Sequence, residues 1–148
     1  MIVAHSRLLA EGAAELGRQM GVGQVRVEPA GGTADGGLGT SIELVARAVR
    51  AAGGGAGVVL LADIGSSVLT AKTFIEDFED FEDLEDVADT EATEATKDVA
   101  GDAAGEVAFA DAPLVEGVVA AASAAAGGAD LAAVVRAAAE AYDFRKTR

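Results

Sequence analysis

The chain of 148 residues contains a single histidine, His5, and its position suggests a chemical role. His5 directly follows the apolar run Ile2, Val3, Ala4, which is typical of a short buried strand. A neutral imidazole is nucleophilic near pH 7 and can accept a phosphoryl group. When a carboxylate accepts a hydrogen bond from one ring nitrogen, the other nitrogen is free to attack. The sequence therefore predicts nucleophilic chemistry at His5 if the fold brings a carboxylate beside it.

Asp63 is the candidate carboxylate, because it ends a second buried apolar run at residues 58–62. We expect Asp63 to orient the imidazole of His5. Two turns of small residues are the candidate phosphoryl-binding segments, because backbone N–H groups at the start of a helix bind anions. These turns consist of Gly39, Thr40 and Ser41, and of Gly65, Ser66 and Ser67.

Other chemistries lack a matching motif. We expect no metal site, because the chain has no cysteine and carboxylates would have to supply every ligand besides His5. A serine hydrolase would need a G-x-S-x-G turn, which is absent. The glycine-rich stretch 30–41 is neither a Walker A loop nor a G-x-G-x-x-G turn after a first strand. A small nucleotide-binding domain remains an alternative without a specific motif, and no dissociable cofactor is expected on this chain.

The elements that must position these residues alternate along the chain. Apolar patterning predicts strands at 1–5, 22–27, 58–63 and 107–109, and helices at 6–20, 42–52, from 65 onward, 114–126 and 131–142. Strands alternating with helices predict an α/β fold, a single doubly wound domain with a mainly parallel central sheet. In such folds the functional site lies beyond the carboxyl ends of the strands. His5, Asp63 and both small-residue turns should therefore meet at one edge of the sheet.

The charge balance excludes several classes of partner. The formal net charge is −14, so neither nucleic acid nor an anionic membrane surface is an expected partner. No run of eighteen apolar residues and no signal-peptide pattern is present, so we expect a cytoplasmic protein without a membrane span. The lack of cysteine fits a reducing cytoplasm. The acid excess predicts a halophilic source, because at about 1 M salt the Debye length falls to about 3 Å and self-repulsion costs little.

One acidic segment interrupts the alternation. Residues 76–102 contain thirteen acids and one base, Lys97. We interpret the segment as an amphipathic helix with a hydrated acidic face, followed by an acidic loop. A site for a divalent cation or for partner docking is the alternative, although no calcium-binding loop motif is present.

Four segments together resemble the DhaM family, the phosphotransferase subunits of phosphoenolpyruvate-dependent dihydroxyacetone kinases. They are VAHSRLLAEGAAELGRQM, GLGTS, VVLLADIGSSVLTAK and DAPLVEGVVAAASAAAGGADL. The resemblance implies a fold similar to the EIIA component of the mannose class of the sugar phosphotransferase system. It also implies one EIIA-like phosphocarrier domain over residues 1–148, with an acidic insertion at about 79–104, and a homodimer.

The resemblance further implies a phosphotransferase that works through a phosphohistidine in dihydroxyacetone and glycerol metabolism. HPr would phosphorylate His5, which would pass the phosphoryl group to ADP held on a DhaL subunit. DhaL and DhaK would then phosphorylate dihydroxyacetone. By the same resemblance Asp63 is catalytic, while Gly39, Thr40, Ser41, Gly65, Ser66 and Ser67 bind the phosphoryl group.

Two further alternatives stay open. A mannose-class EIIA would instead pass the phosphoryl group to a sugar-specific EIIB, against which the DAPLVEG segment argues. A regulatory or scaffolding module of the same fold would carry out no transfer, although the presence of both His5 and Asp63 weighs against it.

Overall fold

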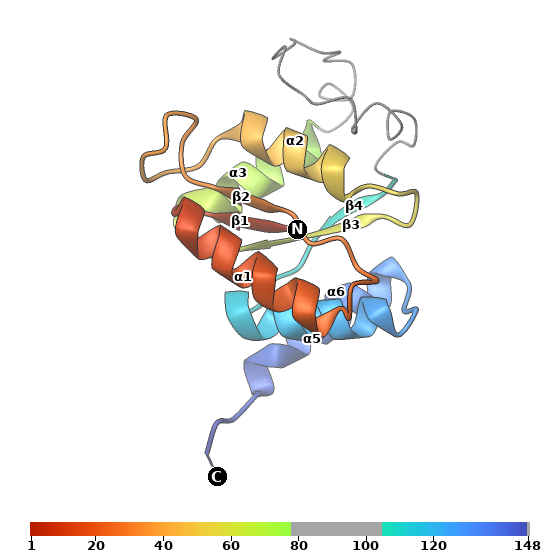
Figure 1. Cartoon of the computed structure of the whole chain (residues 1–148). Coiled ribbons are helices and arrows are strands. Elements are labelled where there is room, and N and C mark those ends of the chain that lie inside the picture. The colour runs from red at the N-terminus through yellow and green to blue at the C-terminus, as the bar shows by residue number, and fades with distance from the viewer. Residues whose placement is uncertain (78–104, 148) are drawn as a thin grey trace.

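The computed structural model describes residues 1–77 and 105–147 (Figure 1). The acidic insertion expected at about 79–104 lies outside the described residues, as does the part of the amphipathic helix expected beyond Asp77. Strands and helices alternate in the described part, as predicted. In chain order they are β1 (Ile2–Ala4), α1 (Arg7–Met20), β2 (Pro29–Gly31), α2 (Ile42–Ala52), β3 (Val58–Ala62), α3 (Gly65–Glu76), β4 (Val107–Phe109), α5 (Leu114–Ala126), α6 (Leu131–Ala139) and the 3-10 helix η2 (Glu140–Asp143).

The four described strands form one sheet in the order β2-β1-β3-β4, and all three pairings are parallel. Val3 of β1 lies opposite Ala30 of β2 on one side and Ala62 of β3 on the other. The predicted α/β fold with a parallel sheet is confirmed. Because β1 and β3 are neighbours, the residues that follow them emerge side by side at the carboxyl edge.

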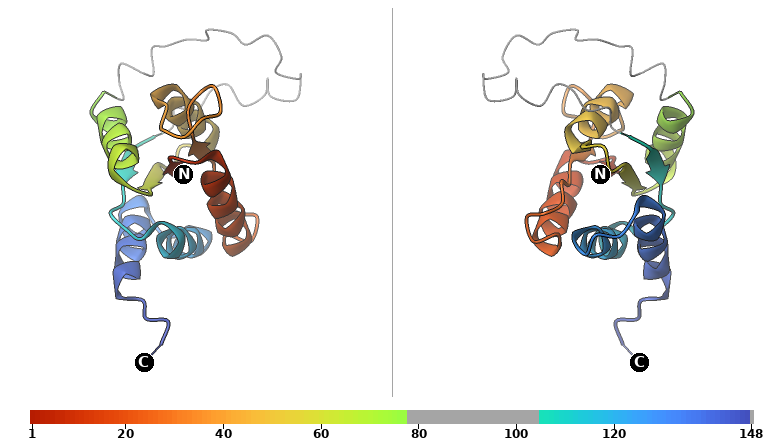
Figure 2. Two further views of the ribbon diagram at one scale, coloured as in Figure 1. Left: turned by 90° about the vertical axis from the view of Figure 1, so that its left-hand side faces the viewer. Right: turned by 90° about the vertical axis from the view of Figure 1, so that its right-hand side faces the viewer.

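Helices cover both faces of the sheet (Figures 1 and 2). Helices α2 and α3 lie on one face, and α1, α5 and α6 lie on the other. Alternate strand residues face opposite layers, so Val3 and Leu60 pack toward α2 and α3 while Ile2 and Leu61 pack toward α1 and α5. In the left view of Figure 2 the carboxyl edge of the sheet faces the reader.

The buried face of α1 is made of small residues. Ala10, Ala13, Ala14 and Gly17 are the buried positions, whereas Leu8 is 70% exposed and Leu9 is 42% exposed. At Gly17 a Cβ atom would lie 2.8 Å from a methyl group of Val118 on α5. The apolar periodicity correctly predicts the helix. Small side chains form its contact with α5, because α1 and α5 pack closely.

The second strand differs from its prediction. It lies at Pro29–Gly31 and not at residues 22–27. A turn occupies the start of the predicted strand, with Val22 at a φ of 52°. The pairing begins later, where the Ile2 backbone N–H donates to the Glu28 carbonyl at 2.9 Å. Val27 is buried in the core without joining the sheet, so burial and not strand pairing accounts for its apolar character.

The last helix is shorter than predicted. It ends as an α-helix at Ala139 and continues as η2, from which the Tyr142 hydroxyl donates to Asp111 at 2.8 Å. Among the described residues no helix combines the length and apolar character that crossing a membrane would require.

Candidate functional site

His5 occupies the junction between β1 and α1. The preceding strand is fully buried, and the following residue, Ser6, caps α1 by accepting a hydrogen bond from Leu9. The backbone of His5 is fixed on two sides. Its N–H donates to Asp63 Oδ2 at 3.0 Å, and its carbonyl accepts from the Gly39 N–H at 2.9 Å. The His5 side chain keeps 27% of its surface exposed, so the ring is both held and accessible.

Asp63 follows β3 and reaches the His5 ring. Its Oδ1 lies 3.1 Å from His5 Nδ1, and its side chain is only 10% exposed. The same oxygen accepts from the Ile64 N–H at 2.7 Å. The sequence prediction that Asp63 would lie beside His5 agrees with this geometry.

The pKa of Asp63 is lower than that of an ordinary aspartate. Burial raises this pKa, but the hydrogen bond from the Ser67 hydroxyl lowers it. The backbone N–H groups of His5 and Ile64 and the His5 ring lower the pKa further. These donors stabilise the charged form, so the carboxylate beside the ring is ionised at neutral pH.

Two serines at the start of α3 contact opposite nitrogens of the ring. Ser66 Oγ lies 2.5 Å from His5 Nε2, and Ser66 is exposed. Ser67 Oγ lies 2.9 Å from Nδ1, and Ser67 is fully buried. The two neighbouring hydroxyls therefore differ in access, one facing solvent and the other enclosed between the ring and Asp63.

The partners of the ring indicate its tautomer. An ionised Asp63 can only accept a hydrogen bond, so Nδ1 carries the proton. Nε2 then bears the lone pair and accepts from the Ser66 hydroxyl. The arrangement leaves the nucleophilic nitrogen on the accessible side of the ring, and it places a negative charge behind the other nitrogen.

The Gly39–Thr40–Ser41 turn lies beside the ring without touching it through its side chains. Gly39 binds the His5 carbonyl with its backbone, at a φ of 144° that favours glycine. Thr40 Oγ1 lies 3.0 Å from Thr70 Oγ1 on α3. The Ser41 hydroxyl is engaged at the start of α2, where it accepts from Leu44 and donates to Glu43.

The start of α3 provides free backbone donors. Ile64 occupies the cap position and makes no side-chain cap, and the first described helical hydrogen bonds to its carbonyl come from Ser67 and Val68. Within the described residues the N–H groups of Gly65 and Ser66 therefore lack an acceptor. They lie next to the exposed side of the His5 ring, where an anion could accept from them.

Thr70 is a site neighbour that the sequence reasoning did not identify. It lies one helical turn after Ser66 on α3 and ties that helix to the glycine-rich loop through Thr40. The spacing of Ser66, Thr70 and Thr73 along α3 was the available signal, because residues three or four apart share a helix face. An open hollow of about 500 Å³ lies along this face.

The exposed apolar side chains are unevenly distributed over the described residues. Of the ten exposed large hydrophobic side chains among the described residues, eight belong to segments at the carboxyl edge of the sheet. We call this set the apolar rim: Leu8, Leu9, Leu38, Ile64, Leu69, Val115, Tyr142 and Phe144. The other two, Met20 and Val22, lie at the far end of α1. Exposed apolar side chains that gather in the segments at one edge of a sheet are suited to a protein partner.

No group of three or more potential metal ligands occurs within the described ranges. The site therefore consists of an accessible imidazole, a buried carboxylate, two serine hydroxyls and free backbone donors. This combination can accept an anionic group onto Nε2 and hold its oxygens.

Comparisons with known proteins match most of this chain. The family model EIIA-man, described as the PTS system fructose IIA component, matches residues 1–92. The phosphoryl donor subunit DhaM of PEP-dependent dihydroxyacetone kinase 2 from Listeria innocua serovar 6a is 33% identical over 76 residues. That alignment covers 51% of this chain and 61% of the relative, so it spans less than two thirds of that protein. The crystal structure of the unknown-function protein EF1359 superposes with a TM-score of 0.64 at 25% identity, over 93% of this chain and 89% of that one.

Proposed function

This chain belongs to the EIIA-man family, the family of PTS system fructose IIA components, and from that membership we propose that it is a phosphoryl carrier with His5 as the acceptor. The observation that carries the proposal is the geometry of the imidazole. Asp63 holds Nδ1 from the buried side, and Nε2 faces the accessible side beside Ser66. A nucleophile oriented by a carboxylate in this way is the arrangement that covalent transfer requires.

The transfer step follows from the tautomer. The lone pair of His5 Nε2 attacks the phosphorus atom of a donor phosphohistidine. A new N–P bond forms while the bond from phosphorus to the donor nitrogen breaks, and that nitrogen recovers its lone pair. The His5 ring keeps its proton on Nδ1 and gains positive charge, which the Asp63 carboxylate balances at 3.1 Å.

Ser66 and the start of α3 are proposed to receive the phosphoryl oxygens. The Ser66 hydroxyl binds Nε2 in the free protein, so it must move when phosphorus arrives, and it can then donate to a phosphoryl oxygen. The N–H groups of Gly65 and Ser66 add two donors at a helix start. Gly39, Thr40 and Ser41 on the neighbouring loop are proposed as further contacts of the phosphoryl group. Gly39 also binds the His5 carbonyl through its backbone N–H.

The buried position of Ser67 favours a positioning role over direct contact with the phosphoryl group. It is fully buried on the Nδ1 side of the ring, away from the attacking nitrogen. Its hydroxyl binds the Asp63 carboxylate and helps to keep it ionised.

HPr is the proposed donor, and ADP on a DhaL-type subunit that works with DhaK is the proposed acceptor. The DhaM relative supports this pathway, and the apolar rim supports large protein partners over a small free substrate. We further propose a cytoplasmic protein, a homodimer, and a single domain over residues 1–148. A mannose-class EIIA that serves a sugar-specific EIIB is the second candidate, because the matching family comprises PTS IIA components.

The test is phosphorylation of the purified chain by phosphoenolpyruvate, enzyme I and HPr. One acid-labile, base-stable phosphate per chain is expected, because phosphohistidine has these properties and His5 is the only histidine. His5→Ala should lose the label and keep the far-ultraviolet circular dichroism of the wild type. Label that persists in His5→Ala would contradict the proposal.

The acceptor is tested with the phosphorylated chain. ATP formation after addition of a DhaL-type subunit with bound ADP would support the dihydroxyacetone kinase role. Transfer to a mannose-class EIIB instead would favour the second candidate. Absence of any labelling of His5 would favour the alternative that the chain is a regulatory module without phosphoryl transfer.

A further inference from the structure

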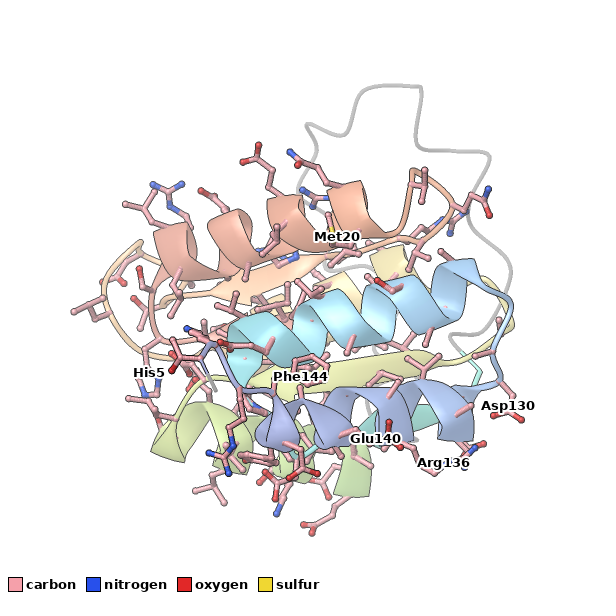
Figure 3. The ribbon with its side chains drawn as sticks, turned by 90° about the horizontal axis from the view of Figure 1, so that it is seen from below. His5, Met20, Asp130, Arg136, Glu140 and Phe144 are labelled. Atoms are coloured by element: carbon pink, nitrogen blue, oxygen red, sulfur yellow. The ribbon has the colours of Figure 1, made fainter. Side chains whose placement is uncertain are left out.

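A second hollow lies at the opposite end of the sheet from His5. Its volume is about 300 Å³, and its walls come from β1, β3, α5, α6 and the loops that precede β2 and β3. One wall residue, Ala129, is adjacent to Asp130, which lies at the far end of the molecule from His5 in Figure 3. We call this hollow the basal pocket. It shares no lining residue with the candidate phosphoryl site.

The wall of the basal pocket is mostly apolar, and small side chains keep it open. Helix α5 contributes Val118 and a series of alanines, including Ala125, and the loop before β3 contributes a series of glycines, including Gly54. At Gly54 a Cβ atom would have only the Arg26 guanidinium within 4 Å. Water in such a space loses hydrogen bonds, whereas a hydrocarbon group fills it favourably.

Arg26 is the one charged side chain among the residues that line the pocket. It is exposed, and its Nη1 donates to the Gly53 carbonyl at 2.6 Å. That bond holds the guanidinium at the end of α2. Among the described residues Arg26 has no carboxylate partner, although the chain has 25 acids and 11 bases. Within residues 1–77 and 105–147 the remaining N–H groups of the guanidinium have no acceptor, and they can bind a planar anion in two-pronged fashion.

We propose that the basal pocket binds a small amphipathic carboxylate, with its hydrocarbon body between α5 and the glycine loop and its carboxylate on Arg26. The apolar wall selects the hydrocarbon body, and the guanidinium of Arg26, which has no carboxylate partner in the described part of the chain, selects the anionic head. In 1 M salt, the condition of the experiment below, the Debye length is about 3 Å, so repulsion between the net charge of −14 and an anion is screened beyond that distance. The short-range contact with Arg26 then decides the preference.

The experiment titrates the full chain with sodium octanoate by isothermal calorimetry in 1 M salt, with 1-octanol as the uncharged probe. Saturable binding of octanoate at one site per chain is expected, with weaker binding of 1-octanol. Ala125→Leu should abolish the binding of both probes, because the half-buried Ala125 lines the pocket and leucine would fill it. Arg26→Gln should weaken octanoate about tenfold and leave 1-octanol unchanged, as expected for losing a charged hydrogen bond.

Two control variants test the contribution of the charge at position 26 and the independence of octanoate binding from the phosphoryl site. Arg26→Lys keeps the charge but loses the planar two-pronged contact, so its octanoate affinity should fall between those of the wild type and Arg26→Gln. His5→Ala should bind octanoate as the wild type does, because His5 lies at the opposite edge, so binding is measured independently of phosphoryl transfer.

Failure of wild-type binding to saturate would overturn the proposal. Octanoate binding that survives Ala125→Leu would do the same, because the ligand would then sit elsewhere. Equal affinity of octanoate for wild type and Arg26→Gln would overturn the assigned role of the guanidinium.

Discussion

At the scale of single residues, the site separates three tasks among neighbouring side chains. His5 presents Nε2 to the accessible side, Asp63 supplies charge behind Nδ1, and Ser67 fills the buried space between them. Ser66, one position earlier, faces outward to the other nitrogen. Two adjacent helical residues can reach opposite nitrogens because the ring lies against the first turn of α3. The proposed role of each residue therefore depends on the side of the ring on which it lies, not only on its chemical type.

Asp63→Asn isolates the contribution of the carboxylate charge. Asparagine has nearly the same shape and can still accept from Nδ1, but it cannot balance the charge that develops on the ring. The rate of His5 phosphorylation, measured by rapid quench with HPr as donor, should fall by about 10²- to 10⁴-fold. Asp130→Asn is the matched control, because Asp130 caps α6 at the far end of the molecule and asparagine is also a good cap. A rate for Asp63→Asn within twofold of wild type would show that the charge does not assist transfer.

At the scale of elements, the close approach of β2 and α1 positions the chain just after His5. Gly31 ends β2 directly against the first turn of α1. A Cβ atom at Gly31 would lie 2.5 Å from the Ser6 carbonyl oxygen and 2.8 Å from Arg7 Cα. Both are backbone atoms that cannot move aside alone. The absence of a side chain at Gly31 therefore lets β2 pair with β1 beside the start of the helix.

Gly31→Ala should lower the free energy of unfolding by about 1–3 kcal/mol, because overpacking against backbone forces β2 and α1 apart. It should also slow His5 phosphorylation, since Ser6 adjoins the acceptor. Gly12→Ala is the opposing control within α1. Its added Cβ atom would meet nothing within 4 Å, so it should stabilise the chain by about 0.5–1 kcal/mol through helix propensity. Urea unfolding measures both changes, and equal stability of the two variants would refute the steric argument.

At the scale of the whole molecule, the excess of acids predicts that stability depends on salt. The net charge of −14 includes thirteen acids within residues 76–102, a segment whose larger part lies outside the described residues. Only three ion pairs occur among the described residues, one of which involves the His5 ring. Most acids in the described part are thus not paired with a base. Salt would reduce the electrostatic repulsion between them by screening.

The melting temperature should rise steeply between low salt and molar salt, because the Debye length shrinks from about 10 Å at 0.1 M to about 3 Å at 1 M. Differential scanning calorimetry over that range measures the effect. Deleting residues 89–102 should flatten the salt dependence by removing like charges, and it should leave His5 phosphorylation intact. An unchanged melting temperature across the range would remove the halophilic interpretation. Loss of phosphorylation in a folded deletion variant would indicate that the acidic segment docks the donor.

The sequence by itself determined most of the local elements and the edge of the sheet at which the candidate site lies. Strand and helix periods are local signals, so β1, β3 and α1 were predicted near their observed positions. In a parallel sheet the residues after each strand share one edge, so the sequence alone predicts that His5 and Asp63 lie together. The sequence could not supply β2, because Pro29, Ala30 and Gly31 carry no strand signal and become a strand only by pairing with β1.

Only the tertiary structure decided which nitrogen of the His5 ring faces the accessible side and which faces Asp63. The strand order puts β3 beside β1, and this long-range pairing brings the Asp63 carboxylate to Nδ1. Burial then distinguishes Ser67 from Ser66, although the two are adjacent and chemically identical. Packing also exposes Leu8 at the apolar rim and buries alanines in its place. The burial of each of these side chains depends on which elements pack against each other. Elements that are distant in the sequence make these contacts, and no local sequence pattern specifies them.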